Sequence, residues 1–205
     1  TSVSLTSAAN ATLLGNTAPL YVALVSWLIF RERLKGKFWL GLACALAGAG
    51  LVLGNDFLNH PKFGVGDLLA LSSGAFYGGY FLVTERGRQR LDTLSYVWLA
   101  TLTAGLLNLG FSLALGMSVT GYPPQTYLAF LAAALISQVT GYLTVGYALG
   151  HLPASIVSPT MILQPVLTAL LAIPLLGETL HPAQWSGGLI VLLGIYLVHR
   201  SREAG

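Results

Sequence analysis

The stretch PLYVALVSWLIFRERLKGKFWLGLACALAGAGLV at residues 19–52 returns in altered form as PVLTALLAIPLLGETLHPAQWSGGLIVLLGIYLV at residues 165–198. The two copies align without a gap at a shift of 146 residues and share eleven identities. Apolar composition alone would match some Leu and Ala, but it would not bring Pro, Glu, Trp and two Gly into register. Each copy predicts a helix with an internal proline, a terminal glutamate, a turn and a glycine-spaced helix. The identical pairs are Pro19/Pro165, Ala23/Ala169, Leu24/Leu170, Glu32/Glu178, Leu34/Leu180, Trp39/Trp185, Gly41/Gly187, Leu46/Leu192, Gly48/Gly194, Leu51/Leu197 and Val52/Val198.

The composition around this repeat is that of a membrane protein. Of 205 residues, 55% are hydrophobic and 8% are charged, whereas a soluble domain carries about 25% charged residues. A water-soluble enzyme of this size could not cover itself with so few charges. The single cysteine, Cys44, excludes a disulfide scaffold. The net charge is +3, but the basic residues form no dense patch, so we expect the lipid bilayer, and no nucleic acid, as the partner.

Seven stretches are long and apolar enough for helices that cross a bilayer, which takes about 20 residues each. Most show no period-2 alternation, which argues against a membrane barrel. Gly, Ala, Ser and Thr recur in every stretch, and such small residues let membrane helices pack closely. The sequence therefore predicts an all-α polytopic membrane protein. The stretches are residues 8–30, 37–54, 65–84, 94–116, 125–149, 155–176 and 183–199.

The distribution of basic residues predicts the orientation. The segments after the first, third and seventh stretches hold four, three and two Lys or Arg residues, which is nine of the ten in the chain. Alternate loops lie on the same side of a membrane, and the side rich in Lys and Arg is cytoplasmic. We therefore expect a cytoplasmic C-terminus. The nine residues are Arg31, Arg33, Lys35, Lys37, Arg86, Arg88, Arg90, Arg200 and Arg202.

The shift between the two copies covers five predicted spans, so the copies should have opposite orientations in the membrane. Inverted repeats of this kind are typical of secondary transporters; the alternative is a duplicated hairpin kept for packing. A second half that starts near Gly66, moved back by 146 residues, would start about 80 residues before Thr1, which leaves space for three more helices. We therefore predict seven complete helices of a ten-helix, 5+5 bundle. Residues 1–63 would end the first repeat, and residues 64–205 would form the second.

Three segments resemble the EamA family of the drug/metabolite transporter superfamily. ANATLLGNTAPLYVALVSWLIFRERL at residues 9–34 is similar to the family's fourth helix, and SPTMILQPVLTALLAIPLLGETL at residues 158–180 to its ninth. GDLLALSSGAFYGGY at residues 66–80 resembles the start of the family's second domain, and the Pro-to-Glu spacing of 13 occurs in both halves. The resemblance implies ten helices, two inverted halves, a central cavity, and export or exchange of small metabolites such as amino acids.

Uncharged polar residues within the predicted spans are the candidates for binding a substrate. Polar groups in lipid need partners, so their helix faces should turn inward. Ser73, Tyr77 and Tyr80 share one helix face, and Gln138 and Tyr142 share another by their i, i+4 spacing. Hydrogen bonds between helices are the alternative interpretation for each residue. The substrate-binding candidates are Asn16, Ser73, Tyr77, Tyr80, Gln138, Tyr142, Thr160 and Gln164.

The repeated proline and glutamate are candidates for a hinge or a structural role. Pro19 and Pro165 each remove a backbone donor from mid-helix, and broken helices often frame transporter sites. Glu32 and Glu178 end their helices and could stabilise the turn of each repeat and so set a gate. Tolerated kinks and interfacial capping are the alternatives.

Catalysis is not indicated. The four His residues lie at or near predicted loops without metal-ligand spacing, and no glycine-rich stretch is followed by Lys-Ser or Lys-Thr. We therefore expect no enzyme activity, no metal and no cofactor. The sequence predicts a transporter of the bacterial inner membrane that exports or exchanges amino-acid-like or amphipathic metabolites by alternating access. A structural or assembly protein without transport is the alternative, and a homodimer stays open.

Overall fold

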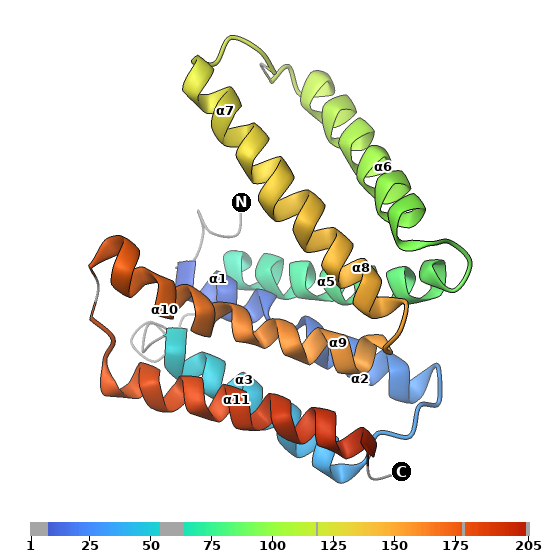
Figure 1. Ribbon diagram of the computed structural model, residues 1–205, viewed down its shortest axis with the longest axis vertical. Helices are drawn as coiled ribbons and strands as arrows, with labels where there is room; N and C mark the ends of the chain where they lie inside the picture. The colour runs from blue at the N-terminus through green and yellow to red at the C-terminus, as the bar shows by residue number, and fades with distance from the viewer. Residues whose placement is uncertain (1–7, 54–63, 118, 178, 204–205) are drawn as a thin grey trace. The chain divides into compact units, whose positions relative to one another are not determined.

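The computed structural model describes residues 8–53, 64–117, 119–177 and 179–203, and these residues form helices and connecting segments without a strand. Figure 1 shows the helices in chain order. The elements are α1 (Ala8–Gly15), α2 (Ala18–Leu28), α3 (Gly36–Leu53), α5 (Val65–Arg88), α6 (Thr93–Ala114), α7 (Pro124–Ala133), the π-helix η1 (Ala134–Gly141), α8 (Tyr142–Leu149), α9 (Ala154–Thr160), the 3₁₀ turn η2 (Met161–Leu163), α10 (Gln164–Leu176) and α11 (Pro182–Glu203).

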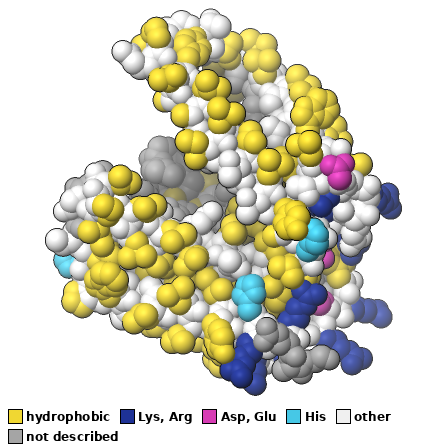
Figure 2. Space-filling view, viewed as in Figure 1, with side chains coloured by type: hydrophobic (Ala, Val, Ile, Leu, Met, Phe, Trp, Pro, Cys, Tyr) yellow, Lys and Arg dark blue, Asp and Glu magenta, His cyan; other side chains and the backbone are white. Residues whose placement is uncertain are grey.

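Six helical segments of the described chain are long and apolar enough to cross a membrane, and hydrophobic side chains cover much of the visible face in Figure 2. The predicted stretch at 65–84 forms a helix of 24 residues, α5, but does not reach the same hydropathy. Asp67, together with the Gly, Ser and Tyr residues, lowers the mean hydropathy without shortening the helix. Seven spans therefore stay a prediction. The six segments are Ala11–Leu28, Gly36–Leu53, Thr93–Ala114, Pro124–Leu149, Ala154–Leu175 and Pro182–Arg202.

The helices form two compact units. The first contains residues 1–82 and 154–205, so α1, α2, α3 and most of α5 belong with α9, η2, α10 and α11. The second contains residues 83–153, from the end of α5 through α6, α7, η1 and α8. The first unit thus joins the two copies of the repeat, which are far apart in the sequence.

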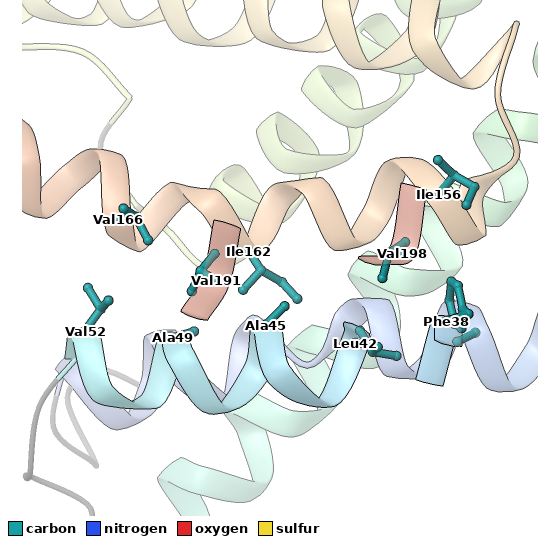
Figure 3. Close-up of a cluster of buried hydrophobic side chains, with 11 residues drawn as sticks. Phe38, Leu42, Ala45, Ala49, Val52, Ile156, Ile162, Val166, Val191 and Val198 are labelled. Carbon is teal, nitrogen blue, oxygen red and sulfur yellow. The ribbon is translucent and has the colours of Figure 1, made fainter. Parts of the chain in front are cut away.

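The core of the first unit lies where α3 packs against α11, α9, η2 and α10. Figure 3 shows Phe38 at one end of this core with Val198 and Ile156, and Val52 and Val166 at the other end. All five of these side chains are buried. The core therefore runs the length of α3.

The glycines of the repeat allow α3 and α11 to touch at their backbones. A Cβ atom on Gly41 would lie 2.7 Å from the carbonyl oxygen of Gly194, and one on Gly194 would lie 2.5 Å from the backbone nitrogen of Ala45. Cβ atoms on Gly48 and Gly187 would likewise lie 2.7 and 2.8 Å from each other's carbonyl oxygens. Any side chain at these positions would collide with backbone.

The order of these contacts is reciprocal. Gly41 and Gly187 are equivalent in the repeat, as are Gly48 and Gly194; in the structure Gly41 meets Gly194 and Gly48 meets Gly187. Gly41 thus contacts the equivalent of Gly48, and Gly48 contacts the equivalent of Gly41. Such reciprocal contacts are those of two elements related by a twofold axis. The two helices run antiparallel, because residue numbers rise along one helix as they fall along the other.

Both copies interrupt their first helix at equivalent positions. The break at Asn16 and Thr17 separates α1 from α2, and η2 (Met161–Leu163) separates α9 from α10. Each break lies just before the repeated proline, Pro19 or Pro165, which cannot donate a backbone hydrogen bond to the preceding turn. The prolines therefore mark broken helices, and their role as hinges stays a prediction.

The turn after each broken helix is also equivalent in the two copies. Arg31 has φ 54° and Gly177, 146 residues later, has φ 69°. The left-handed backbone conformation is unfavourable for a residue with a side chain, whereas glycine adopts it without this cost. Both positions directly precede a repeated glutamate, Glu32 or Glu178. The two copies therefore share a left-handed backbone at this turn, although one has Arg31 and the other has Gly177.

Glu32 joins two segments that are 123 positions apart. Its Oε1 accepts a hydrogen bond of 2.7 Å from the hydroxyl of Ser155, the second residue of α9, and Ser155 is fully buried. A negative charge is favourable at a helix N-terminus. This contact supports the structural interpretation of Glu32; Glu178 lies outside the described residues, so its role stays a prediction.

Candidate functional site

A pocket of about 430 Å³ lies between α6 and the η1–α8 segment of the second unit. Small-molecule sites of roughly 300–1,000 Å³ are mostly apolar with a few polar groups, and this lining fits that description. Its polar side chains are Thr101 and Gln138, accompanied by the indole of Trp98. The lining residues are Leu94, Val97, Trp98, Thr101, Leu102, Gly105, Leu106, Leu109, Gln138, Val139 and Leu143.

Gln138 reaches this pocket from the π-helix η1. Thr140, in the same element, donates its hydroxyl to the carbonyl of Leu135, five residues earlier, over 3.1 Å. A π-helix holds more residues per turn than an α-helix and is found frequently at functional sites. Gln138 is thus a substrate-binding candidate from the sequence that lines a pocket in the structure.

Tyr142 was expected to share a face with Gln138, but it does not line the pocket. The expectation used the α-helical spacing of i and i+4. Gln138 belongs to the π-helix η1 whereas Tyr142 begins α8, so the spacing crosses a change of helix type. The role of Tyr142 in binding stays a prediction.

Sequence reasoning missed the α6 side of the pocket. Trp98, Thr101 and Gly105 are spaced by three and four residues, so they share one face of α6. An aromatic, a hydroxyl and a glycine on one stripe of an otherwise apolar helix was the available signal. Gly105 has no other atom within 4 Å of the position that a Cβ would take, so this side of the pocket has open space.

Polar contacts hold the ends of the helices in the second unit. Asp92 caps α6 by accepting the backbone N–H of Ser95 over 3.0 Å, and hydrogen bonds from the side chain and backbone of Ser95 lower the pKa of this carboxyl group. Arg88 donates from Nε to the carbonyl of Gly146 over 2.9 Å, close to the end of α8. A cation near a helix C-terminus is favourable. The Arg88 hydrogen bond links the end of α5 to α8.

In the first unit, the predicted aromatic pair lies together on α5. Tyr77 and Tyr80 stack with centroids 5.9 Å apart and planes 4° apart, and the buried Phe81 meets both edge-on. Ser73 is exposed on the same helix. Tyr77 and Tyr80 thus lie side by side on α5, while the place of Ser73 on the same face and the contact of all three residues with a substrate stay predictions.

The first broken helix packs directly on α5. A Cβ on Gly74 would lie 2.9 Å from Oγ1 of Thr17 and 3.1 Å from the carbonyl oxygen of Leu14. Asn16 donates from Nδ2 to the carbonyl of Thr12 over 2.9 Å. This bond within the helix favours the structural interpretation of Asn16.

The two candidates near the second broken helix have different surroundings. The hydroxyl of Thr160 lies 3.0 Å from Nε2 of His199 on α11 and 3.3 Å from the carbonyl of Ile156. The contact with His199 fits the alternative interpretation of Thr160, a hydrogen bond between helices. Gln164 begins α10 and is exposed. Binding by either residue stays a prediction.

Among the described residues, no three His, Cys, Asp or Glu side chains lie close enough to hold a metal ion. The side chains that line the pocket offer apolar contact, stacking on an indole and hydrogen bonding to uncharged groups.

The model of the EamA-like transporter family matches residues 1–54 and 64–200. An uncharacterized transporter of Bacillus subtilis, YwfM, is 26% identical over 188 residues, covering 89% of this chain and 61% of the relative. A "Probable amino-acid metabolite efflux pump" of Salmonella typhimurium is 29% identical over 180 residues, covering 82% of this chain and 60% of the relative. The chain thus spans about three fifths of the length of these curated relatives.

A solved crystal structure shares the fold. It superposes with a TM-score of 0.79 at 20% sequence identity, covering 98% of this chain and 70% of the other. The match extends over both units of the chain. With its apolar helices and the family match over most of its length, this multi-pass membrane protein belongs to the EamA-like transporter family.

Proposed function

We propose that this protein is a transporter of the bacterial inner membrane that exports or exchanges small amphipathic, amino-acid-like metabolites by alternating access. Family membership supports transport. The substrate class is supported by two relatives: the efflux pump of Salmonella typhimurium and a "Probable terminal-alkyne amino-acid exporter" of Streptantibioticus cattleyicolor, 25% identical over 202 residues. The names of both relatives describe the export of amino acids or their metabolites.

The pocket of the second unit is the observation that carries the substrate proposal. It offers a long apolar wall from α6 and a single amide, that of Gln138, on the opposite side. In this proposal, the apolar part of the substrate lies against Trp98 and Leu102, and its polar part bonds to the Gln138 amide. A carboxylate, ammonium or amide of the substrate can each pair with an amide that both donates and accepts.

Transport by proteoliposomes tests this function. The complete protein is reconstituted and efflux is measured for a panel of apolar and polar amino acids. We expect Gln138→Ala to lower the rate about threefold to tenfold, because one hydrogen bond contributes roughly 0.5–1.5 kcal/mol. Gln125→Ala, the same substitution at an exposed residue of α7 outside the pocket, is the matched control and should leave the rate unchanged.

Two results would contradict the proposal. Efflux equal to that of empty vesicles for the whole panel would favour a structural membrane protein. Unchanged efflux in Gln138→Ala, at equal protein abundance, would remove the pocket from the transport path while leaving transport itself intact.

We also propose that the two repeat copies have opposite orientations and that the C-terminus is cytoplasmic. The reciprocal contacts of α3 and α11 support the inversion, and the asymmetry of basic residues supports the direction. The ten-helix, 5+5 architecture belongs to the same proposal.

Cysteine labelling tests the orientation. Arg33→Cys and His181→Cys, placed singly in a Cys44→Ala background, replace exposed residues of equivalent turns in the two copies. We expect a membrane-impermeant maleimide, added to intact cells, to label the cysteine at 181 and to label that at 33 only after lysis. Labelling of both from the same side would disprove the inversion.

A further inference from the structure

A second pocket, of about 100 Å³, lies between α3, α10 and α11 of the first unit. Its volume is several times the roughly 10–15 Å³ that a single water molecule needs. Val52 and Val166, at one end of the core in Figure 3, form its inner wall. Trp185 and Leu189, which are 52% and 62% exposed, form part of its rim. The pocket therefore reaches from the core to the outer surface of apolar helices.

The repeat shows which side chains stand at the equivalent place in the first copy. Gln184 and Gly188, which line it, are equivalent to Phe38 and Leu42 at the shift of 146 residues. Phe38 and Leu42 are each 1% exposed and belong to the core. A phenyl ring and an isobutyl group thus fill the first copy where the second copy has an amide and a hydrogen atom.

The walls of the pocket favour a hydrocarbon occupant. The amide of Gln184 is already used: its Oε1 accepts the backbone N–H of His181 over 2.9 Å, and its Nε2 donates to the carbonyl of Val52 over 3.3 Å. The other lining residues are apolar apart from the indole N–H of Trp185. A polar metabolite would leave most of its groups without partners, at a cost of about 1–3 kcal/mol each.

We infer that this pocket binds the acyl chain of a membrane phospholipid. The helices around it are of membrane-spanning length and hydropathy, so the medium at its rim is hydrocarbon. An empty pocket would deprive its walls of dispersion contacts, and a flexible methylene chain restores them. The lipid chain takes the place that Phe38 and Leu42 occupy in the first copy.

Quenching of Trp185 fluorescence by brominated lipid tests the inference. Trp27→Phe, Trp39→Phe and Trp98→Phe leave Trp185 as the single tryptophan of this sequence, and any tryptophan elsewhere in the complete protein is likewise replaced by Phe. The protein is reconstituted into phosphatidylcholine vesicles in which half of the lipids carry dibrominated acyl chains. Bromine quenches tryptophan fluorescence on contact. Gly188→Leu introduces the residue of the first copy and fills the pocket, so it should keep the brominated chain away from Trp185. We therefore expect this variant to weaken quenching at least twofold.

Two further variants make the result specific. Gly50→Leu adds the same side chain on α3, where no other atom lies within 4 Å of a new Cβ, and it should leave quenching unchanged. A Cβ at position 188 would lie 3.3 Å from Cγ1 of Val166, so Gly188→Ala is a milder change that preserves folding. It should weaken quenching by a smaller amount than Gly188→Leu.

The inference is overturned if Gly188→Leu and Gly188→Ala quench as strongly as the parent, or if Gly50→Leu weakens quenching equally. It is also overturned if quenching in the parent is weak and rises as protein is diluted in lipid, since a second copy of the chain would then fill the pocket. None of these outcomes depends on transport activity.

Discussion

Replacement of Gly194 or Gly48 by valine is expected to abolish most of the folded protein. At Gly194 a Cβ would lie 2.6 Å from the carbonyl oxygen of Gly41, and at Gly48 it would lie 2.7 Å from that of Gly187. Overpacking a core costs about 1–3 kcal/mol when side chains can move, but here the opposing atoms are backbone. The α3–α11 pair would have to separate, and the core of the first unit would open with it.

The measurement is the amount of monodisperse protein after extraction in mild detergent, followed by size-exclusion chromatography. We expect at least tenfold less for Gly194→Val and Gly48→Val. Gly50→Val is the matched control: it lies two residues from Gly48 on the same helix, with open space at its Cβ, and should give the amount of the parent. Equal amounts for all three variants would contradict the close helix contact.

Filling the pocket of the second unit is expected to stop transport without unfolding the protein. Gly105 lines the pocket, and no other atom lies within 4 Å of the position that a Cβ would take there, so Gly105→Phe can enter the space without a clash. A benzyl group at this position would narrow the pocket of about 430 Å³ between α6 and η1. If the substrate binds there, the transport rate should fall more than tenfold, a larger loss than that for Gln138→Ala.

Gly110→Phe is the matched control for this prediction. It places the same group on α6, also with no atom within 4 Å of its Cβ, at a residue that does not line the pocket. Its transport rate and abundance should equal those of the parent. Transport by Gly105→Phe at the rate of Gly110→Phe would show that substrate does not enter this pocket.

Much of the fold could be predicted because bilayers impose length and hydropathy on a spanning helix. Five predicted stretches coincide closely with segments that qualify as spans, and a sixth, Ala11–Leu28, lies within the predicted 8–30. The stretch at 65–84 is the informative exception. It forms α5, yet Asp67 and the site candidates Ser73, Tyr77 and Tyr80 lower its hydropathy.

The candidate site was predicted only in part. Gln138 was found because an uncharged polar residue in an apolar span needs a partner. Trp98 and Gly105 were missed, since neither is polar enough to stand out. Tyr142 was grouped with Gln138 by α-helical spacing, but it does not line the pocket. The π-helix η1 was not predicted either, because a local hydrogen-bond register leaves no trace in hydropathy.

The sequence by itself determined the helical membrane class, the repeat at a shift of 146 residues and the equivalence of its glycines. Only the tertiary structure decided that Gly41 meets Gly194, that η1 carries Gln138 to α6, and that Gly188 borders a pocket where Leu42 fills the core. The physical reason is the apolar solvent. Lipid tails are as apolar as leucine, so no hydrophobic force separates a core face from a lipid-facing one. The fit between the surfaces of neighbouring helices decides which face is buried in the core, and this fit is defined only when the helices are packed.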